Sequence, residues 1–278
     1  MIGIVWLASY PKSGNTWLRL ALESLMAGGA PVRLNHVKQL RLGAASRSLL
    51  EEVLGVDTSD LSHEEIEELR PRCYEAIARD AKRPLFMKVH DARISTAGGE
   101  PLFPPDITSA AIYIVRDPRD VAVSYAYHSG VSIDAMIGIM ANPRYVAARG
   151  VSSMSASVPQ RYLSWSAHVE SWLDTPDMKI LLLRYEDMVR DFATELGRVA
   201  AFLGMEPSPG AIAGAVAATR FERLQEAEAS EGFRELAPTA ARFFRKGVAG
   251  GWRTDLSDKQ VRQIESDQGV AMKRMKYA

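Results

Sequence analysis

Four short runs of the chain are almost uniformly apolar, and they constrain the fold more than any other feature of the sequence. Helical patterns separate them, and they cover Ile2–Ala8, Leu85–Val89, Ala111–Val115 and Lys179–Leu183. A strand that is apolar on both faces has to be buried on both faces, as in parallel sheets that helices cover. The alternation with helices favours βαβ units, so the sequence predicts an α/β fold with a central parallel sheet.

Polar sequence follows each of these predicted strands. The four stretches are "SYPKSGNT", "KVHD", "VRDPRD" and "LRYED". In parallel sheets, ligands bind beyond the carboxyl ends of the strands. We therefore expect these stretches to meet and to form the functional site.

The first of these stretches has the features of a phosphate-binding loop. "SYPKSGNTWLR" links a predicted strand to a helical pattern. A helix N-terminus offers unpaired N–H groups and partial positive charge, here at Ser13, Gly14, Asn15 and Thr16. Gly14 permits a close backbone approach, Lys12 adds a charge, the Thr16 hydroxyl adds a donor, and Trp17 could stack on a base. The triphosphate consensus G-x-x-x-x-G-K-[ST] is not met, because Lys12 precedes Gly14. An ordinary strand-to-helix turn shaped by Pro11 is the alternative.

Two further stretches carry arginines suited to anions. In "VRDPRDVAVSY", Arg116 ends a strand and Ser124 falls in the first turns of the next helix. An arginine fork binds phosphate well, although Arg116 or Arg119 could instead pair with a neighbouring aspartate. "FFRKGVAGGW" adds Arg245, Lys246 and Gly247, which suit a second anion site or a solvated basic turn.

The stretch "FMKVHD" places a cation and a base on one face of a strand. Lys88 and His90 are two residues apart, so both side chains point to the same side. A lone histidine is more often structural. Next to a lysine at the mouth of a sheet, it becomes a candidate general base.

Composition excludes several classes of function. The 278 residues suit one domain over 1–278 or two smaller ones, and the formal net charge of zero gives no argument for nucleic acid or an anionic membrane as a partner. No apolar run approaches ~18 residues, so no membrane span is expected, and the apolar start is interpreted as a strand rather than a signal peptide. The single cysteine, Cys73, lies in an amphipathic helical pattern and fits a structural role in a reducing, cytoplasmic setting.

Four motifs together resemble one family. "YPKSGNTW", "RDPRDVAVSY", "RYEDM" and "FRKGVAGGW" occur in this order between Ser9 and about Trp252. They resemble the sulfotransferases that use 3′-phosphoadenosine 5′-phosphosulfate (PAPS), and the start is most similar to bacterial members, including those that sulfate glycopeptide antibiotics. The resemblance implies a P-loop NTPase-like, three-layer fold, with a central parallel sheet of about five strands flanked by helices in a single domain over 1–278.

The resemblance also implies roles for particular residues. Those expected to bind the 5′ side and the adenine of PAPS are Lys12, Ser13, Gly14, Asn15, Thr16, Trp17, Tyr185 and Thr219. Those expected to bind the 3′-phosphate are Arg116, Ser124, Arg245, Lys246 and Gly247. His90 matches the catalytic base, and Lys12 and Lys88 match the lysines that stabilise the transferring group. Val89 stands where the family has threonine in "KTH", and Asn15 stands where another threonine is common.

The expected reaction is transfer of a sulfuryl group to an alcohol or phenol, with no metal required. The acceptor would be a small-molecule or natural-product hydroxyl compound. The alternatives are a P-loop kinase for a nucleotide or adenylyl sulfate, and a nucleotide-binding protein without activity. Three irregular segments, Ile94–Pro105, Gly130–Pro159 and Glu226–Phe243, are expected to build the acceptor pocket. Its candidate apolar residues, which could also be core, are Met136, Met140, Tyr145, Met154, Phe233, Phe243 and Phe244. The family's dimer motif is not evident near the C-terminus, so the oligomeric state stays open.

Overall fold

The centre of the molecule is a sheet of four parallel strands. The computed structural model describes residues 3–37, 40, 42–149 and 155–278. Within them the sheet has the order β2-β1-β3-β6. Its strands are β1 (Ile4–Ser9), β2 (Leu85–Val89), β3 (Thr108–Val115) and β6 (Ile180–Arg184). All four predicted runs are therefore strands, and the described residues contain four strands in this sheet where about five were expected.

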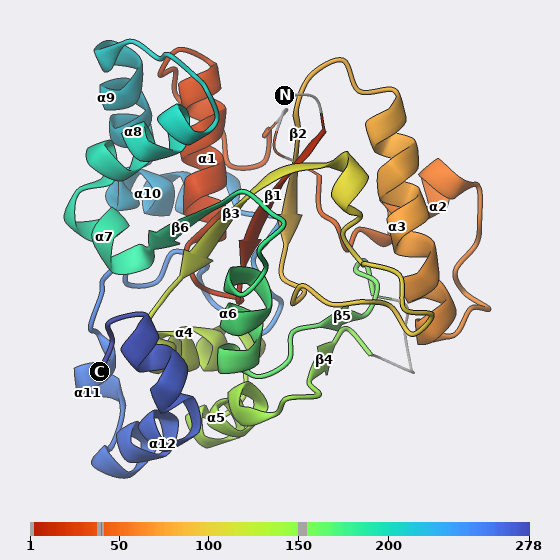
Figure 1. Cartoon of the computed structure of the whole chain (residues 1–278). Coiled ribbons are helices and arrows are strands. Elements are labelled where there is room, and N and C mark those ends of the chain that lie inside the picture. The colour runs from red at the N-terminus through yellow and green to blue at the C-terminus, as the bar shows by residue number, and fades with distance from the viewer. Residues whose placement is uncertain (1–2, 38–39, 41, 150–154) are drawn as a thin grey trace.

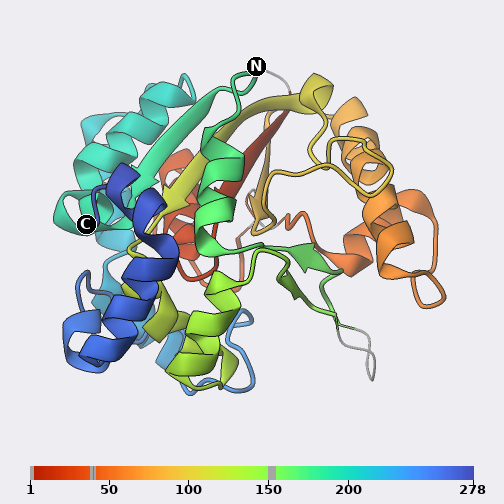
Figure 2. The same cartoon turned by 60° about the horizontal axis from the view of Figure 1, so that its bottom comes forward.

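Alternate side chains of β1 enter two separate cores, which is why the whole strand is apolar. Ile4, Trp6 and Ala8 belong to one buried cluster, whereas Val5 and Leu7 belong to another. Helices cover each face of the sheet, giving three layers (Figures 1 and 2). On the Val5 face these are α1 (Asn15–Met26), α7 (Tyr185–Arg190), α8 (Phe192–Phe202) and α9 (Pro209–Ala218).

The helices on the Trp6 face come from the middle and the end of the chain. They are α3 (His63–Arg79), α4 (Pro118–Ser129), α5 (Ile133–Ala141), α6 (Trp165–Leu173) and α12 (Asp258–Arg274). Helix α12 begins at the predicted capping box, in which Ser257 and Gln260 satisfy each other's backbone N–H groups. The remaining elements are α2 (Arg47–Leu54), the 3-10 turn η1 (Pro105–Ile107), β4 (Val146–Ala147), β5 (Gln160–Arg161), α10 (Phe221–Glu231) and α11 (Trp252–Asp255).

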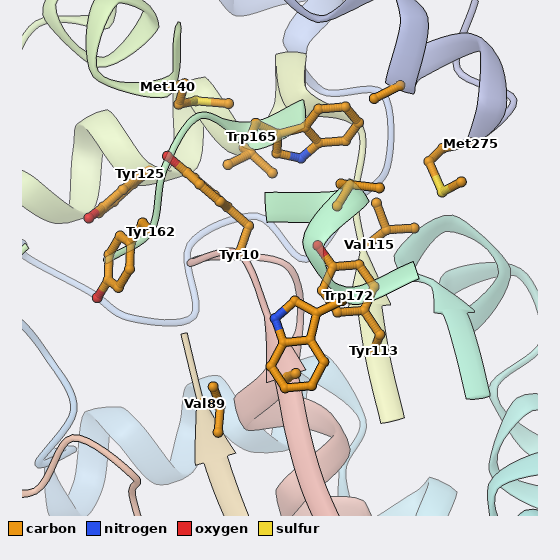
Figure 3. Packing of buried hydrophobic residues seen from close by; sticks show 14 of the residues in the cluster. Tyr10, Val89, Tyr113, Val115, Tyr125, Met140, Tyr162, Trp165, Trp172 and Met275 are labelled. Carbon is orange, nitrogen blue, oxygen red and sulfur yellow. The ribbon is translucent and has the colours of Figure 1, made fainter. Parts of the chain in front are cut away.

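Aromatic side chains fill the core on the Trp6 face, and some of them reach the carboxyl end of the sheet. Figure 3 shows Tyr113 and Trp172 packed over the strands, and Tyr10, Tyr125 and Tyr162 gathered beyond the end of β1. The Tyr10 and Tyr162 ring centroids are 6.1 Å apart and the rings meet edge to face. The core therefore continues without a break to the place where ligands are expected.

Two segments expected to be irregular contain regular structure. Helix α5 lies within Gly130–Pro159, and α10 extends to Glu231 in the segment from Glu226. Met136 and Met140 are buried in the core on the Trp6 face and do not line the cavity at the carboxyl ends of the strands. Met140 is seen within this core in Figure 3. Met154 lies outside the described residues.

Cys73 is buried in α3, and burial raises the pKa of its thiol to about 11. The structural interpretation of this cysteine is therefore confirmed. Among the described residues, no helix is both long enough and apolar enough to span a bilayer.

Candidate active site

A cavity of about 610 Å³ opens at the carboxyl ends of the strands. Among the residues predicted to bind PAPS or to act in catalysis, all line this cavity except Ser13. Small-molecule sites in proteins commonly measure roughly 300–1,000 Å³, so a nucleotide and a small second ligand fit this scale. The cavity has two ends. The loop end is lined by Lys12, Gly14–Trp17, Arg116, Tyr185, Thr219 and Arg245–Gly247, and the tyrosine end is lined by Ser46, Tyr125, Ser157, Gln160 and Tyr162.

The loop after β1 turns sharply because two of its residues have left-handed backbone angles. Lys12 has φ 67° and Gly14 has φ 106°. A Cβ atom at Gly14 would lie 2.8 Å from the Tyr185 ring, so glycine allows both the angle and the close approach. Helix α1 begins directly afterwards, at Asn15. Ser13 is fully buried, and its hydroxyl has no hydrogen-bond partner among the described residues.

Asn15, Thr16 and Trp17 use part of their hydrogen-bonding capacity inside the protein. The Asn15 amide nitrogen donates to the Leu7 carbonyl at 2.8 Å. Its carbonyl oxygen is buried without a partner in the described part of the chain. The Thr16 hydroxyl donates to a carboxylate, that of Glu235, at 3.1 Å, so it is not the free donor that the sequence suggested. The Trp17 indole packs on Phe192, with ring centroids 4.2 Å apart.

His90 follows β2, and its tautomer is set by the backbone of β1. Its Nδ1 lies 2.8 Å from the carbonyl oxygen of Ser9, which can only accept. The Nδ1 atom therefore carries the hydrogen, and in the neutral ring Nε2 is the acceptor. His168 donates from Nε2 to the His90 carbonyl, at 3.1 Å, and accepts at Nδ1 from the Tyr113 hydroxyl. Burial and the neighbouring Lys88 hold the pKa of His90 well below its ordinary value, so the ring is neutral near pH 7.

Lys12 lies among other cations at the loop end. Its ammonium is 4.1 Å from the Phe243 ring centroid and 3.5 Å from Nδ1 of His128. Burial, followed by Lys88 and Arg116, lowers the pKa of Lys12 to about 8. An anion bound here would favour the charged form of this lysine.

His128 was missed at the sequence level, although it lines the cavity. Helical spacing could have found it, since it lies four residues after Ser124 on α4. Burial and the charges of Lys12 and Lys88 lower the pKa of His128 to about 4.

Arg116 joins three parts of the loop end. One guanidinium nitrogen donates to the Lys12 carbonyl at 3.1 Å and another to the Val248 carbonyl at 2.9 Å. The guanidinium carbon lies 4.2 Å from the Tyr185 ring centroid. The alternative of pairing with a neighbouring aspartate holds closely for Arg119, which forms a short ion pair with Asp117, and only loosely for Arg116, which lies 3.9 Å from Asp120.

The stretch from Arg245 to Gly247 closes this end of the cavity. Gly247 has φ 64°, and a Cβ atom there would lie 2.3 Å from the Phe221 ring. Lys246 pairs with Asp255 at 2.6 Å, whereas Arg245 is 3.8 Å from the same carboxylate. Of the two cations, Arg245 is therefore less engaged and the better placed to receive an anion. The Ser124 hydroxyl and Tyr185 also line the cavity, and the Thr219 hydroxyl donates to the Ala215 carbonyl.

Glu235 and Arg19 are two charged residues of the site that sequence reasoning missed. Glu235 accepts from Lys88 at 3.0 Å and from Arg19 at 2.8 Å. Burial alone would raise the pKa of Glu235, but Lys88 and Arg19 lower it below its ordinary value. Glu235 lies in the segment Glu226–Phe243 that was expected to line the acceptor pocket, but it lies outside every motif and far along the chain from its partners, so no local signal marks the residue itself.

The tyrosine end differs from the predicted acceptor pocket. Phe243 and Phe244 line the cavity as expected, but Ile94–Pro105, Tyr145 and Phe233 do not line it. Phe233 is buried with Leu20 and Leu34 instead. Gly43–Ser46 was not predicted, and it comes close because Gly43 and Ser46 form bridges to Lys88 and Ser157. Within the described ranges, no group of three or more histidine, cysteine, aspartate or glutamate side chains is placed to hold a metal ion.

Comparison with known proteins identifies the family. The family model described as "Sulfotransferase domain" matches residues 4–276. Sulfotransferase 1E1 of Cavia porcellus is 26% identical over 261 residues, which are 89% of this chain and 75% of the relative. Cytosolic sulfotransferase 16 of Arabidopsis thaliana is 26% identical over 277 residues, or 92% of this chain and 72% of that one.

Solved structures agree in fold. Mouse sulfotransferase SULT7A1 complexed with PAP has a TM-score of 0.61 at 22% identity, over 98% of this chain and 84% of that one. Retinol dehydratase, in complex with androsterone and the inactive cofactor PAP, has a TM-score of 0.62 at 23% identity, over 97% and 80%. At this level of identity the likeness shows the fold, which is the three-layer, P-loop NTPase-like fold expected from the sequence. The family model and the sequence relatives go further, and the chain belongs to the family of PAPS-dependent sulfotransferases.

Proposed function

We propose that the protein transfers the sulfuryl group of PAPS to the hydroxyl of a small-molecule acceptor, with His90 as the general base. The observation that carries the proposal is the fixed tautomer of His90. Its Nδ1 is held by the Ser9 carbonyl at 2.8 Å, which leaves Nε2 to accept a proton. His90 also lines the same cavity as Lys12 and Lys88, so a base and two cations can act on one reacting centre.

The loop end fits the donor. Gly14 lets the loop backbone lie close against the Tyr185 ring, and the buried Ser13 hydroxyl has no partner among the described residues. We assign the 5′ side to Lys12, the N–H groups of residues 13–16 and Trp17. We assign the 3′-phosphate to Arg116, Ser124, Arg245, Lys246 and Gly247, and the adenine side to Tyr185 and Thr219. PAPS, when bound, supplies an activated sulfuryl group and a phosphate leaving group.

Each protein group then has a defined task. His90 Nε2 takes the proton of the acceptor hydroxyl. At the same time the hydroxyl oxygen bonds to sulfur, and the bond between sulfur and the 5′-phosphate oxygen breaks. Lys12, Lys88 and the loop N–H groups stabilise the charge that builds on that leaving oxygen. These cations occupy the place that a divalent metal has in phosphoryl transfer by kinases.

The acceptor belongs at the tyrosine end. Tyr162 lies beside His90, with ring centroids 6.2 Å apart, and Gln160 and Ser157 line the wall beyond it. Aromatic faces and polar groups together suit a hydroxylated small molecule, and a natural-product acceptor stays a prediction. The single-domain organisation and the cytoplasmic location also stay predictions.

One paired experiment separates this function from its rivals. Calorimetric titration with 3′-phosphoadenosine 5′-phosphate (PAP), with and without Mg²⁺, is combined with a sulfate-transfer assay against phenols, sterols, sugars and peptides. We expect metal-independent binding of PAP and transfer that survives EDTA. Strict dependence on Mg²⁺ would point to a kinase, and tight PAP binding without transfer to any acceptor would point to an inactive nucleotide-binding protein.

A further inference from the structure

Glu235 brings a carboxylate into the middle of the cationic site. One of its oxygens accepts from Lys88 at 3.0 Å and from the Thr16 hydroxyl at 3.1 Å. The other accepts from Arg19 at 2.8 Å. These three partners come from β2 and from two positions one turn apart on α1. A single side chain therefore connects the end of β2 to the first turn of the helix that follows the loop.

The surroundings of Glu235 keep it in place. Arg19 is only 6% exposed, and its other hydrogen bonds go to the Leu40 carbonyl, so Glu235 is its carboxylate partner. A buried guanidinium left without its carboxylate would be costly. Next to Glu235, Asn35 accepts from the Arg234 N–H at 2.9 Å and donates to the Gly232 carbonyl at 3.0 Å. Displacement of the Glu235 side chain by an incoming anion would leave the buried Arg19 guanidinium without its carboxylate.

A fixed carboxylate has a direct consequence for Lys88. A lysine ammonium sits on a flexible four-carbon stem and samples many positions unless a partner holds it. Lys88 is paired with Glu235. The other two carboxylates of the cavity lining have other partners: Asp120 accepts from the Gly250 N–H, and Asp255 pairs with Lys246. Catalytic groups act through accurate placement, and a misplacement of about 1 Å can cost up to roughly 100-fold in rate.

We propose that Glu235 is a positioning residue for sulfuryl transfer, whose carboxylate holds the Lys88 ammonium against the first turn of α1, where the transferring group must pass. This inference rests on the role of Lys88 in the proposed function. If the inference holds, the negative charge of Glu235 weakens donor binding, because it lies beside an anion site, and at the same time speeds transfer. Removal of that charge should therefore slow transfer without weakening donor binding.

The test is Glu235→Gln, which keeps the shape of the side chain. The amide oxygen can still accept from Arg19, but its NH₂ group then faces Lys88 and repels it. We expect PAP affinity to stay equal or to rise, because a negative charge is removed, while kcat falls by about 10- to 100-fold. Glu231→Gln is the matched control. Glu231 lies four residues earlier, is 3.9 Å from Arg33, and does not line the cavity.

A double-mutant cycle with Lys88→Ala decides between positioning and a general structural role. If Glu235 acts through Lys88, then Glu235→Gln slows the Lys88→Ala enzyme by less than twofold. The inference about Glu235 would be wrong if the rate losses of the two single variants multiply in the double variant, or if the Glu235→Gln enzyme is as fast as the parent. Either result would leave the proposed function intact. A Lys88→Ala enzyme as fast as the parent would remove the proposed role of Lys88 and this inference with it. Should Glu235→Gln fail to fold, Glu235→Asp keeps the charge near Arg19, lacks the reach to Lys88, and enters the same cycle.

Discussion

The two ends of the cavity are built in different ways. At the loop end, Lys12, Arg116 and Tyr185 follow directly after β1, β3 and β6, and Arg116 ties the first of these segments to the later stretch at Val248 through the carbonyls of Lys12 and Val248. At the tyrosine end, walls come from a short two-stranded ladder and from Gly43–Ser46, in which Gly43 forms an isolated bridge to Lys88 of β2 and Ser46 forms one to Ser157. A group fixed by a strand end has one position, whereas a loop wall can be rebuilt without disturbing the sheet. We infer that this protein holds its donor rigidly and that its acceptor choice can change.

The largest expected effect lies at the boundary between the two ends. His90→Asn should keep PAP binding and lose about 10²–10⁴ in turnover, or about 3–5 kcal/mol of barrier, because a general base is removed. The loss should shrink for acidic phenols, which need less help to lose a proton. Steady-state rates across a series of phenols measure it.

His128→Asn is the matched variant, because His128 lines the same cavity and has a lowered pKa as well. We expect it to lose much less turnover than His90→Asn. If the His90 variant turns over normally with an aliphatic alcohol while the His128 variant does not, the two histidines have been assigned the wrong way round.

The next effect tests the loop end alone. Arg245→Ala should weaken PAP binding by roughly ten- to a hundred-fold, the effect of ~1.5–3 kcal/mol for a lost charged hydrogen bond. Binding of adenosine 5′-phosphate should change little. Arg116→Ala should weaken the binding of both nucleotides, because Arg116 also donates a hydrogen bond to the Lys12 carbonyl. Equal losses for the two nucleotides in the Arg245 variant would show that the 3′-phosphate site is misplaced.

Two glycines test whether the backbone of the loop end is fixed, with Gly138, outside both ends of the cavity, as the reference position. Gly14→Ala places a Cβ atom 2.8 Å from Tyr185 at φ 106°, and we expect the free energy of unfolding to fall by about 1–3 kcal/mol. Gly138 lies inside α5, and a Cβ atom there would meet no described atom within 4 Å. Gly138→Ala should therefore raise the free energy of unfolding by about 0.5–1 kcal/mol. Denaturant unfolding measures both, and a Gly14→Ala protein as stable as the parent contradicts the rigid loop.

The last expected effect is a pH dependence of donor binding. Free Lys12 has a pKa of about 8, lowered mainly by burial, and a bound anion raises it. The affinity for PAP is therefore highest well below pH 8 and falls as the pH rises through the pKa of Lys12 in the unliganded protein. Between pH 7 and 9 the loss should reach about tenfold. Lys12→Arg, whose charge is permanent, should bind PAP with a flat profile over this range, and a parent profile that is already flat would show that Lys12 does not titrate here.

The sequence predicts the loop end better than the tyrosine end for a physical reason. Uniformly apolar runs identify the strands, and polar residues beside them are placed by the strands themselves. Asn15 shows where this prediction stops. The sequence marks it as a residue of the binding loop, but its amide also donates to the Leu7 carbonyl and so supports β1. Glu235 could not be predicted, since its three contacts join segments that only the fold brings together. Helix α5 was missed because its sequence, "IDAMIGIMA", is apolar nearly all round and shows no amphipathic pattern.

The order of strands in the sheet also has a consequence for how the chain is made. β1 is synthesised first, but its two partners begin at Leu85 and Thr108. At about 5–20 residues per second, the ribosome needs roughly 5–20 s to supply both. During that time a strand with no polar face has nothing to pair with, and contacts so distant in sequence form slowly. The nascent chain is therefore a natural client for chaperones, and yields on overexpression should depend on them more than the stability of the finished protein suggests.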